Sequence, residues 1–153
     1  MNEIIEMHEM VYKDFTVSLS GKTSEIIGHG LYHGYEWYIL SMHTHPCAYI
    51  VLERNNKVLS YGDSCEALDE VINCHGGVTY SDDYLGQNGM FVNKDKYLWV
   101  IGWDYHHWDD YSGTFNNLES ISGDVDAYGH RWTTEEIYDE IKDVIKQIMG
   151  VNI

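Results

Sequence analysis

The clearest hydrophobic pattern in this chain lies near its C-terminal end. Apolar residues recur there at intervals of three and four, the spacing of one side of an α-helix: Ile137, Ile141, Val144, Ile145 and Ile148. Thr133 and Glu136 precede this run at the spacing of a capping box, and Gly150 is placed to end the helix. We expect an amphipathic helix whose apolar side covers a β-sheet.

Alternating and short apolar runs predict strands over much of the remaining chain. Segments 35–42 and 47–53 form a predicted antiparallel pair, and segment 10–19 is also β-like. Segment 97–103 is the most apolar, and we expect it in the centre of the sheet. The pattern predicts an α+β fold: a single domain, residues 1–153, with a largely antiparallel sheet packed by the C-terminal amphipathic helix.

Turn-forming residues divide these strands. Asn55 and Asn56 predict a turn, and the adjacent glycines at 76 and 77 permit a bulge or a tight bend. The sequence predicts a short acidic helix at 64–71 and a loop at 111–130. The polar residues that could carry chemistry therefore fall mainly at strand ends next to loops, where a rigid scaffold usually holds a functional site.

The chain is strongly acidic. It carries 25 Asp and Glu against 9 Lys and Arg, a formal net charge of −16. Segments 58–93 and 97–130 contain neither Lys nor Arg. Such a surface repels phosphate backbones, which disfavours direct binding of duplex nucleic acid through a basic groove.

Other features of the composition bear on location. No stretch reaches the ~18 uninterrupted apolar residues of a membrane span, and the acidic N-terminal segment is unlike a secretory signal. Cys47, Cys65 and Cys74 form no recognisable disulfide framework, as expected in a reducing compartment. We expect a cytoplasmic protein with no membrane partner.

A cluster of histidines and aspartates directly follows segment 97–103. Imidazole and carboxylate groups are the ligands that Zn, Mn and Mg use in proteins. If the chain turns helically here, Asp104, His107 and Asp110 lie near one another; if it stays extended, His106 replaces His107. We favour His107, because a strand that ends in Trp-Asp is expected to turn. The same residues are also typical of a solvated polar turn.

A second segment pairs a histidine with two glycines. The run His75-Gly76-Gly77 lets the backbone approach a ligand closely, although glycines also mark an ordinary bend. Thr79 and Ser81 share one face of the strand expected to continue from it. Ser81 would need a base within hydrogen-bond reach to act as a nucleophile.

Three further side chains complete the candidate site. His45 precedes the second strand of the predicted pair and is a candidate general acid or base. Trp103 and Trp108 flank the Asp-His cluster, and they either wall a ligand pocket or belong to the core. A structural zinc site is disfavoured because the chain has no Cys-x-x-Cys pair.

Three motifs in this order resemble those of a family of small bacteriophage and prophage proteins that has no assigned reaction. The family carries HGGxTYS, then IGFDxxHxxD, then a WTxEE helix start; this chain has HGGVTYS at 75–81, IGWDYHHWDD at 101–110 and WTTEE at 132–136. The resemblance covers about residues 34–148. The chain departs from the family pattern at Trp103, where Phe is usual, and at Tyr105, where a small residue or Cys often stands. The resemblance implies a bacterial host cell, and it favours His107 over His106 and Asp110 over Asp109.

The first function that these residues suggest is a metal-dependent hydrolase of a phosphodiester or a nucleotide. A divalent Zn, Mn or Mg ion would activate water and neutralise developing phosphate charge. The candidate catalytic residues are His45, His75, Asp104 and His107. The candidate metal ligands are His75, Asp104, His107 and Asp110, and the candidate pocket residues are Thr79, Ser81, Trp103 and Trp108.

The second function is an acidic, non-enzymatic phage effector that inhibits or sequesters a host defence component. Carboxylates presented in place of phosphates would bind a basic host protein, and a pocket version would trap a nucleotide-like signal. A structural role in the phage particle is the third hypothesis, although the chain shows no coiled coil or extended arm. The residues place the hydrolase narrowly first and leave the substrate and the oligomeric state open.

Overall fold

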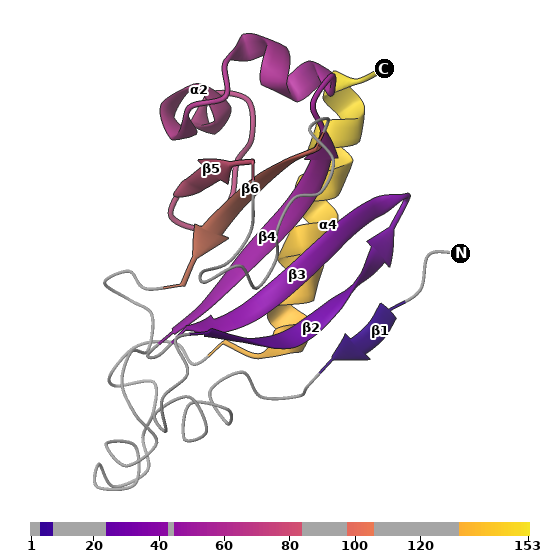
Figure 1. Ribbon diagram of the computed structural model, residues 1–153, viewed down its shortest axis with the longest axis vertical. Helices are drawn as coiled ribbons and strands as arrows, with labels where there is room; N and C mark the ends of the chain where they lie inside the picture. Colours follow the sequence, from indigo (N-terminus) through magenta and orange to yellow (C-terminus); the bar gives the residue numbers. More distant parts are fainter. Residues whose placement is uncertain (1–3, 8–23, 43–44, 84–97, 106–131) are drawn as a thin grey trace, which may run out of the picture.

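The computed structural model of the chain describes residues 4–7, 24–42, 45–83, 98–105 and 132–153 (Figure 1). The segments at 10–19 and 111–130 lie outside these residues, as do the candidate site residues His107, Trp108 and Asp110. No helix within the described ranges is long and apolar enough to cross a membrane.

Six strands of the described residues form one antiparallel sheet in the order β1-β2-β3-β4-β6-β5 (Figure 1). The strands are β1 (Ile4–Met7), β2 (Ser24–Tyr32), β3 (Tyr35–Met42), β4 (His45–Glu53), β5 (Tyr80–Asp82) and β6 (Leu98–Asp104). The predicted pair is confirmed as β3 and β4, although β4 already begins at His45. The most apolar segment becomes β6, which is interior but lies one strand from the end of this sheet rather than in its centre. The α+β fold class is confirmed.

The C-terminal helix α4 (Thr134–Val151) covers one face of the sheet, and Figure 1 shows it lying across β3 and β4. The capping box is confirmed, since Thr133 and Glu136 each accept a hydrogen bond from the other's backbone N–H. The predicted end at Gly150 is wrong, because the helix continues to Val151. Asn152 supports this last turn: its amide donates to the oxygen of Ile148 over 2.8 Å, and its Oδ1 accepts from the N–H of Lys57 over 2.9 Å.

Two short helices follow β4 at the end of the molecule where α4 finishes (Figure 1). They are the 3₁₀-helix η2 (Lys57–Tyr61) and the α-helix α2 (Cys65–Asp69). Side-chain oxygens of Asn56 and Ser64 cap them by accepting backbone N–H bonds over 3.0 and 3.1 Å. Both the predicted turn after β4 and the predicted short acidic helix are thereby confirmed.

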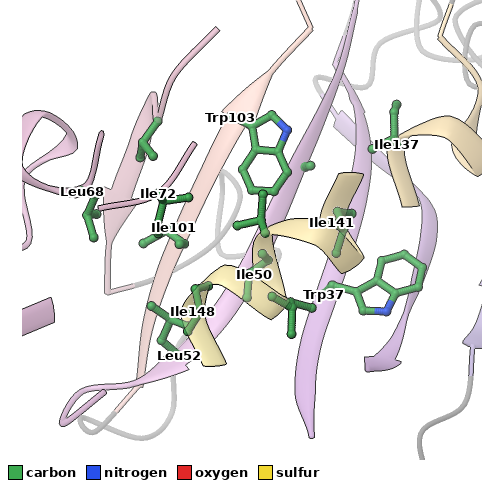
Figure 2. Packing of buried hydrophobic residues seen from close by; sticks show 14 of the residues in the cluster. Trp37, Ile50, Leu52, Leu68, Ile72, Ile101, Trp103, Ile137, Ile141 and Ile148 are labelled. Atoms are coloured by element: carbon green, nitrogen blue, oxygen red, sulfur yellow. The ribbon is translucent and has the colours of Figure 1, made fainter. Parts of the chain in front are cut away.

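The two faces of the sheet carry different side chains. Facing α4, residues such as Ile50, Ile101 and Trp103 pack against Ile141 and Ile148 to form the main core (Figure 2). The opposite face carries a smaller buried cluster: Leu40, Cys47, Tyr49 and Val100. Because successive residues of a strand point to opposite faces, this assignment decides which candidate side chains can meet.

Candidate functional site

The His75-Gly76-Gly77 run forms the predicted tight bend. The N–H of Gly77 donates to the oxygen of Cys74 over 3.1 Å, and the φ angles of Gly76 and Gly77 are 70° and 90°. A Cβ at Gly77 would lie 2.8 Å from Oδ2 of Asp69, whose Oδ1 accepts from the N–H of Val78 over 2.8 Å. The turn and this close approach account for both glycines without a ligand.

Two polar side chains of α4 hold this turn against the helix. Glu140 Oε2 accepts from the backbone N–H of His75 over 2.6 Å. Gln147 makes a paired contact with Asn73, accepting from its N–H over 2.7 Å and donating to its oxygen over 2.8 Å. Since Glu140 and Gln147 are seven residues apart, they lie on the same side of the helix. The position of His75 is therefore set by α4.

The His75 ring belongs to an aromatic cluster on the α4 face of the sheet. It stacks on Tyr105, with ring centroids 4.8 Å apart, and meets the edge of Trp132 at 5.0 Å. Trp103 Nε1 donates to the Tyr105 hydroxyl over 3.0 Å, and that hydroxyl donates to Glu140. Burial, followed by the nearby Glu140 carboxylate, raises the pKa of Tyr105 far above its usual value. The tyrosine is therefore held as a neutral donor.

Asp104 lies on the other face of the sheet. It pairs with Cys47 across β4 and β6, and Cys47 belongs to the cluster on the face away from α4. Burial, and next the Asp104 carboxylate, raise the pKa of the Cys47 thiol to about 12, so the thiol stays protonated at neutral pH. His45 stands two residues before Cys47 on β4 and so shares the face of Asp104.

The structure thus brings His45 and Asp104 to one face at one end of the sheet, and it places His75 on the opposite face. The predicted catalytic and metal-binding sets, which combine His75 with Asp104, are divided by the sheet. Within the residues that the structure describes, no group of three or more His, Cys, Asp or Glu side chains is arranged to hold a metal ion. The remaining predicted ligands, His107 and Asp110, lie outside the described residues.

The predicted pocket residues that the structure describes have other surroundings. Ser81 accepts from Trp99 Nε1 over 2.8 Å and donates to the backbone oxygen of Asp63, so its hydroxyl is part of the packing of β5. Thr79 is exposed, and its backbone N–H donates to Gly102 over 3.0 Å. Trp103 is 1% exposed and belongs to the core rather than to an open pocket.

The most distinctive surface of the described residues is acidic. Six carboxylates and no Lys or Arg lie between residues 58 and 83, and the structure gathers this segment into η2, α2 and β5 at one end of the molecule (Figure 1). We call residues 58–83 the acidic end; Lys57, the first residue of η2, precedes it. Its carboxylates belong to Asp63, Glu66, Asp69, Glu70, Asp82 and Asp83.

An open groove of about 520 Å³ lies between η2 and α2 within the acidic end. Its lining residues are Tyr61, Glu66, Ala67, Glu70 and Val71. Tyr61 is 62% exposed, so its aromatic ring is open to solvent at the edge of the groove. The absence of Lys and Arg was visible in the sequence, but the groove forms only when η2 and α2 fold beside each other.

Sequence analysis also missed Glu140 and Gln147. Both flank the apolar stripe of α4, and this position next to a buried face was the available signal. Comparisons of the chain with protein-family models, with curated proteins and with solved structures gave no match.

Proposed function

We propose that this chain is an acidic, non-enzymatic effector that binds the basic surface of a host protein. The observation that supports this function best is the concentration of carboxylates in the acidic end. The acidic end carries six carboxylates with no Lys or Arg, and the chain as a whole has a net charge of −16. A surface of one sign steers an oppositely charged partner and repels partners of its own sign.

The chemistry of the acidic end indicates the class of partner. Proteins that bind nucleic acids present Lys and Arg to phosphates. A surface rich in carboxylates can bind the same Lys and Arg side chains and so compete with the nucleic acid. The phage-type motifs favour a bacterial host cell, in which such a partner would be a defence component. The effector would then act by occupying the site at which that component binds nucleic acid.

Three polar side chains in and near the candidate site support a binding protein more than an enzyme. The Ser81 hydroxyl is used in bonds to Trp99 and Asp63, and the Cys47 thiol has a pKa of about 12. His75 packs on Tyr105 on the face opposite Asp104. These contacts give each side chain a role in holding the fold together.

Capture from a bacterial lysate tests this function. We expect the immobilised protein to retain basic nucleic-acid-binding proteins at low salt, and both moderate salt and excess duplex DNA to release them. A variant with Glu66→Gln, Glu70→Gln, Asp82→Asn and Asp83→Asn should retain markedly less. Retention of mainly acidic or neutral proteins, or retention that salt does not weaken, would contradict the proposal.

The matched control for this capture changes an acidic pair elsewhere. Glu135 and Asp139 are exposed and four residues apart on α4, the same spacing as Glu66 and Glu70. We expect Glu135→Gln with Asp139→Asn to leave retention nearly unchanged. An equal loss in this control would show that net charge matters and that the acidic end has no special role.

One observation favours the metal-dependent hydrolase as a second candidate function. His45 and Asp104 share a face at the end of the sheet from which the chain continues toward His107 and Asp110. Together they would provide imidazole and carboxylate ligands for Zn, Mn or Mg. His75 would not belong to such a site, because it lies across the sheet.

This second candidate makes a specific prediction about metal content. Protein purified without a metal-chelating tag should contain near-stoichiometric metal by elemental mass spectrometry, and Asp104→Ala should remove it. The His75→Ala variant should keep the metal, in contrast to the predicted ligand set. Metal at a hundred times its dissociation constant would stabilise the fold by about 2.7 kcal/mol, visible as a higher melting temperature. Absence of metal from the unmodified protein, with no shift on addition of Zn, Mn or Mg, would exclude this candidate.

A further inference from the structure

The chain itself shows how an arginine is held beside the acidic end. Cζ of Arg54 lies 4.4 Å from the centroid of the Trp99 ring, and its guanidinium donates to Asp63 Oδ2 over 2.7 Å. An aromatic face and a carboxylate together satisfy both properties of a guanidinium, its flat charged surface and its N–H donors. Trp99 and Asp63 thus bind an arginine side chain of the same chain.

The groove between η2 and α2 presents the same two kinds of group with no cation among its lining residues. Tyr61 supplies an exposed aromatic ring, while Glu66 and Glu70 supply carboxylates. Ala67 and Val71 add apolar surface suited to the methylene stem of a long side chain. The groove therefore matches an arginine in chemistry, and nothing that lines it neutralises its carboxylates.

Glu66 and Glu70 also differ from the other carboxylates of this segment in what they do for the fold. Asp63 binds Arg54, and Asp69 binds the N–H of Val78. The side chains of Glu66 and Glu70 make no hydrogen bond or ion pair to the described residues. They stand four apart, where like charges repel, and Glu70 occupies the C-cap of α2, the end of a helix that favours cations. An incoming cation would relieve both unfavourable interactions.

We propose that the groove between η2 and α2 binds an arginine side chain from a basic segment of the partner protein. Its guanidinium stacks on Tyr61 and donates to Glu66 and Glu70, while its stem lies along Val71. Arginine fits better than lysine because its planar group can stack on the ring and donate to a carboxylate at once. This inference rests on the proposed function and identifies the point at which the partner docks.

Titration of the full chain with two peptides tests the inference. The probes are a short oligo-arginine peptide and an oligo-lysine peptide of the same length, and binding is measured by calorimetry at low salt. We expect the arginine peptide to bind several times more tightly. Tyr61→Leu, and separately Glu66→Gln with Glu70→Gln, should each weaken it about fivefold to tenfold. Tyr61→Phe keeps the ring and should keep the affinity.

The matched control is again Glu135→Gln with Asp139→Asn, which removes the same charge from α4 and should change the affinity less than about twofold. The substituted carboxylates are exposed, and Tyr61 lines the open groove, so the variants should melt at nearly the same temperature. Amide NMR shifts on addition of the arginine peptide should concentrate in residues 61–71.

The outcomes separate this inference from the function on which it rests. Equal affinity for both peptides, weakened as much by the α4 control as by the groove variants, would overturn the arginine site and leave a general acidic binding protein. Affinity unchanged in Tyr61→Leu would overturn the stacking role of Tyr61. Shifts in residues 61–71 caused by Mg²⁺ alone, or by raising the concentration of the chain itself, would assign the groove to another occupant. Failure of both peptides to bind at low salt would overturn the proposed function as well.

Discussion

Replacing Gly102 by alanine is expected to lower the free energy of unfolding by about 3 kcal/mol or more. A Cβ at this position would lie 2.5 Å from Cδ1 of Tyr49 and 2.6 Å from the backbone oxygen of Ala48. Both atoms belong to β4, which is paired with β6 in the interior of the sheet, so the strands cannot separate without breaking hydrogen bonds. Thermal unfolding followed by circular dichroism should show a fall of roughly 6–12 °C.

The control for this substitution is Gly150→Ala in α4. A Cβ at Gly150 has nothing within 4 Å, so the variant should be more stable by about 0.5–1 kcal/mol, the usual gain for replacing a helical glycine. Adding Tyr49→Ala to Gly102→Ala removes the ring contact but leaves the Ala48 oxygen in place. The double variant should therefore lose less than the sum of the two single losses. A melting temperature unchanged by Gly102→Ala would contradict the close packing of Tyr49 over β6.

Replacing Glu140 by alanine should have the second largest effect, a loss of about 2–4 kcal/mol. One oxygen of this carboxylate accepts from the Tyr105 hydroxyl and the other from the backbone N–H of His75. Tyr105 is fully buried, so its hydroxyl would lose its acceptor where water cannot replace it. The N–H of His75 would be released at the same time, which should loosen the 74–77 turn from α4. Denaturant unfolding measures the loss.

A double-mutant cycle isolates the contact within this prediction. Tyr105→Phe removes only the hydroxyl, and its coupling with Glu140→Ala should be about 1–3 kcal/mol. Glu135→Ala removes an exposed carboxylate from the first turn of the same helix and should cost at most about 1 kcal/mol. Equal stability of the Glu140→Ala and Glu135→Ala variants would contradict the role of the Glu140 carboxylate in holding the 74–77 turn.

Local sequence patterns predict some parts of the candidate site and not others. The tight bend at His75-Gly76-Gly77 and the strand over 97–103 could both be predicted from the sequence; both are confirmed, although the strand β6 runs from Leu98 to Asp104. Alternation along β6 also separates Asp104 from Tyr105. It does not indicate which face a turn from elsewhere in the chain will contact. The face that the His75 turn contacts is decided by Glu140 and Tyr105, which hold His75 on the α4 side of the sheet.

For the acidic end, too, local sequence patterns predict the composition of the surface but not its shape. A stretch without Lys or Arg is visible in the sequence, and repulsion of phosphates by it stays a prediction. No local pattern indicates that Tyr61 lies exposed beside Glu66 and Glu70. That arrangement depends on the turn between η2 and α2, and on the packing of Val58 and Leu68 beneath it.

Local sequence determined the elements of this protein, because capping boxes, helical stripes and strand alternation depend on residues only a few positions apart. The capped helix α4, the β3–β4 pair and the short helix α2 all follow from such patterns. The tertiary structure alone decided that β6 pairs with β4, that the 74–77 turn docks on α4, and that His75 and Asp104 lie on opposite faces. These outcomes depend on contacts between residues far apart in the chain, whose free energy exists only once the core has formed and which no local pattern encodes.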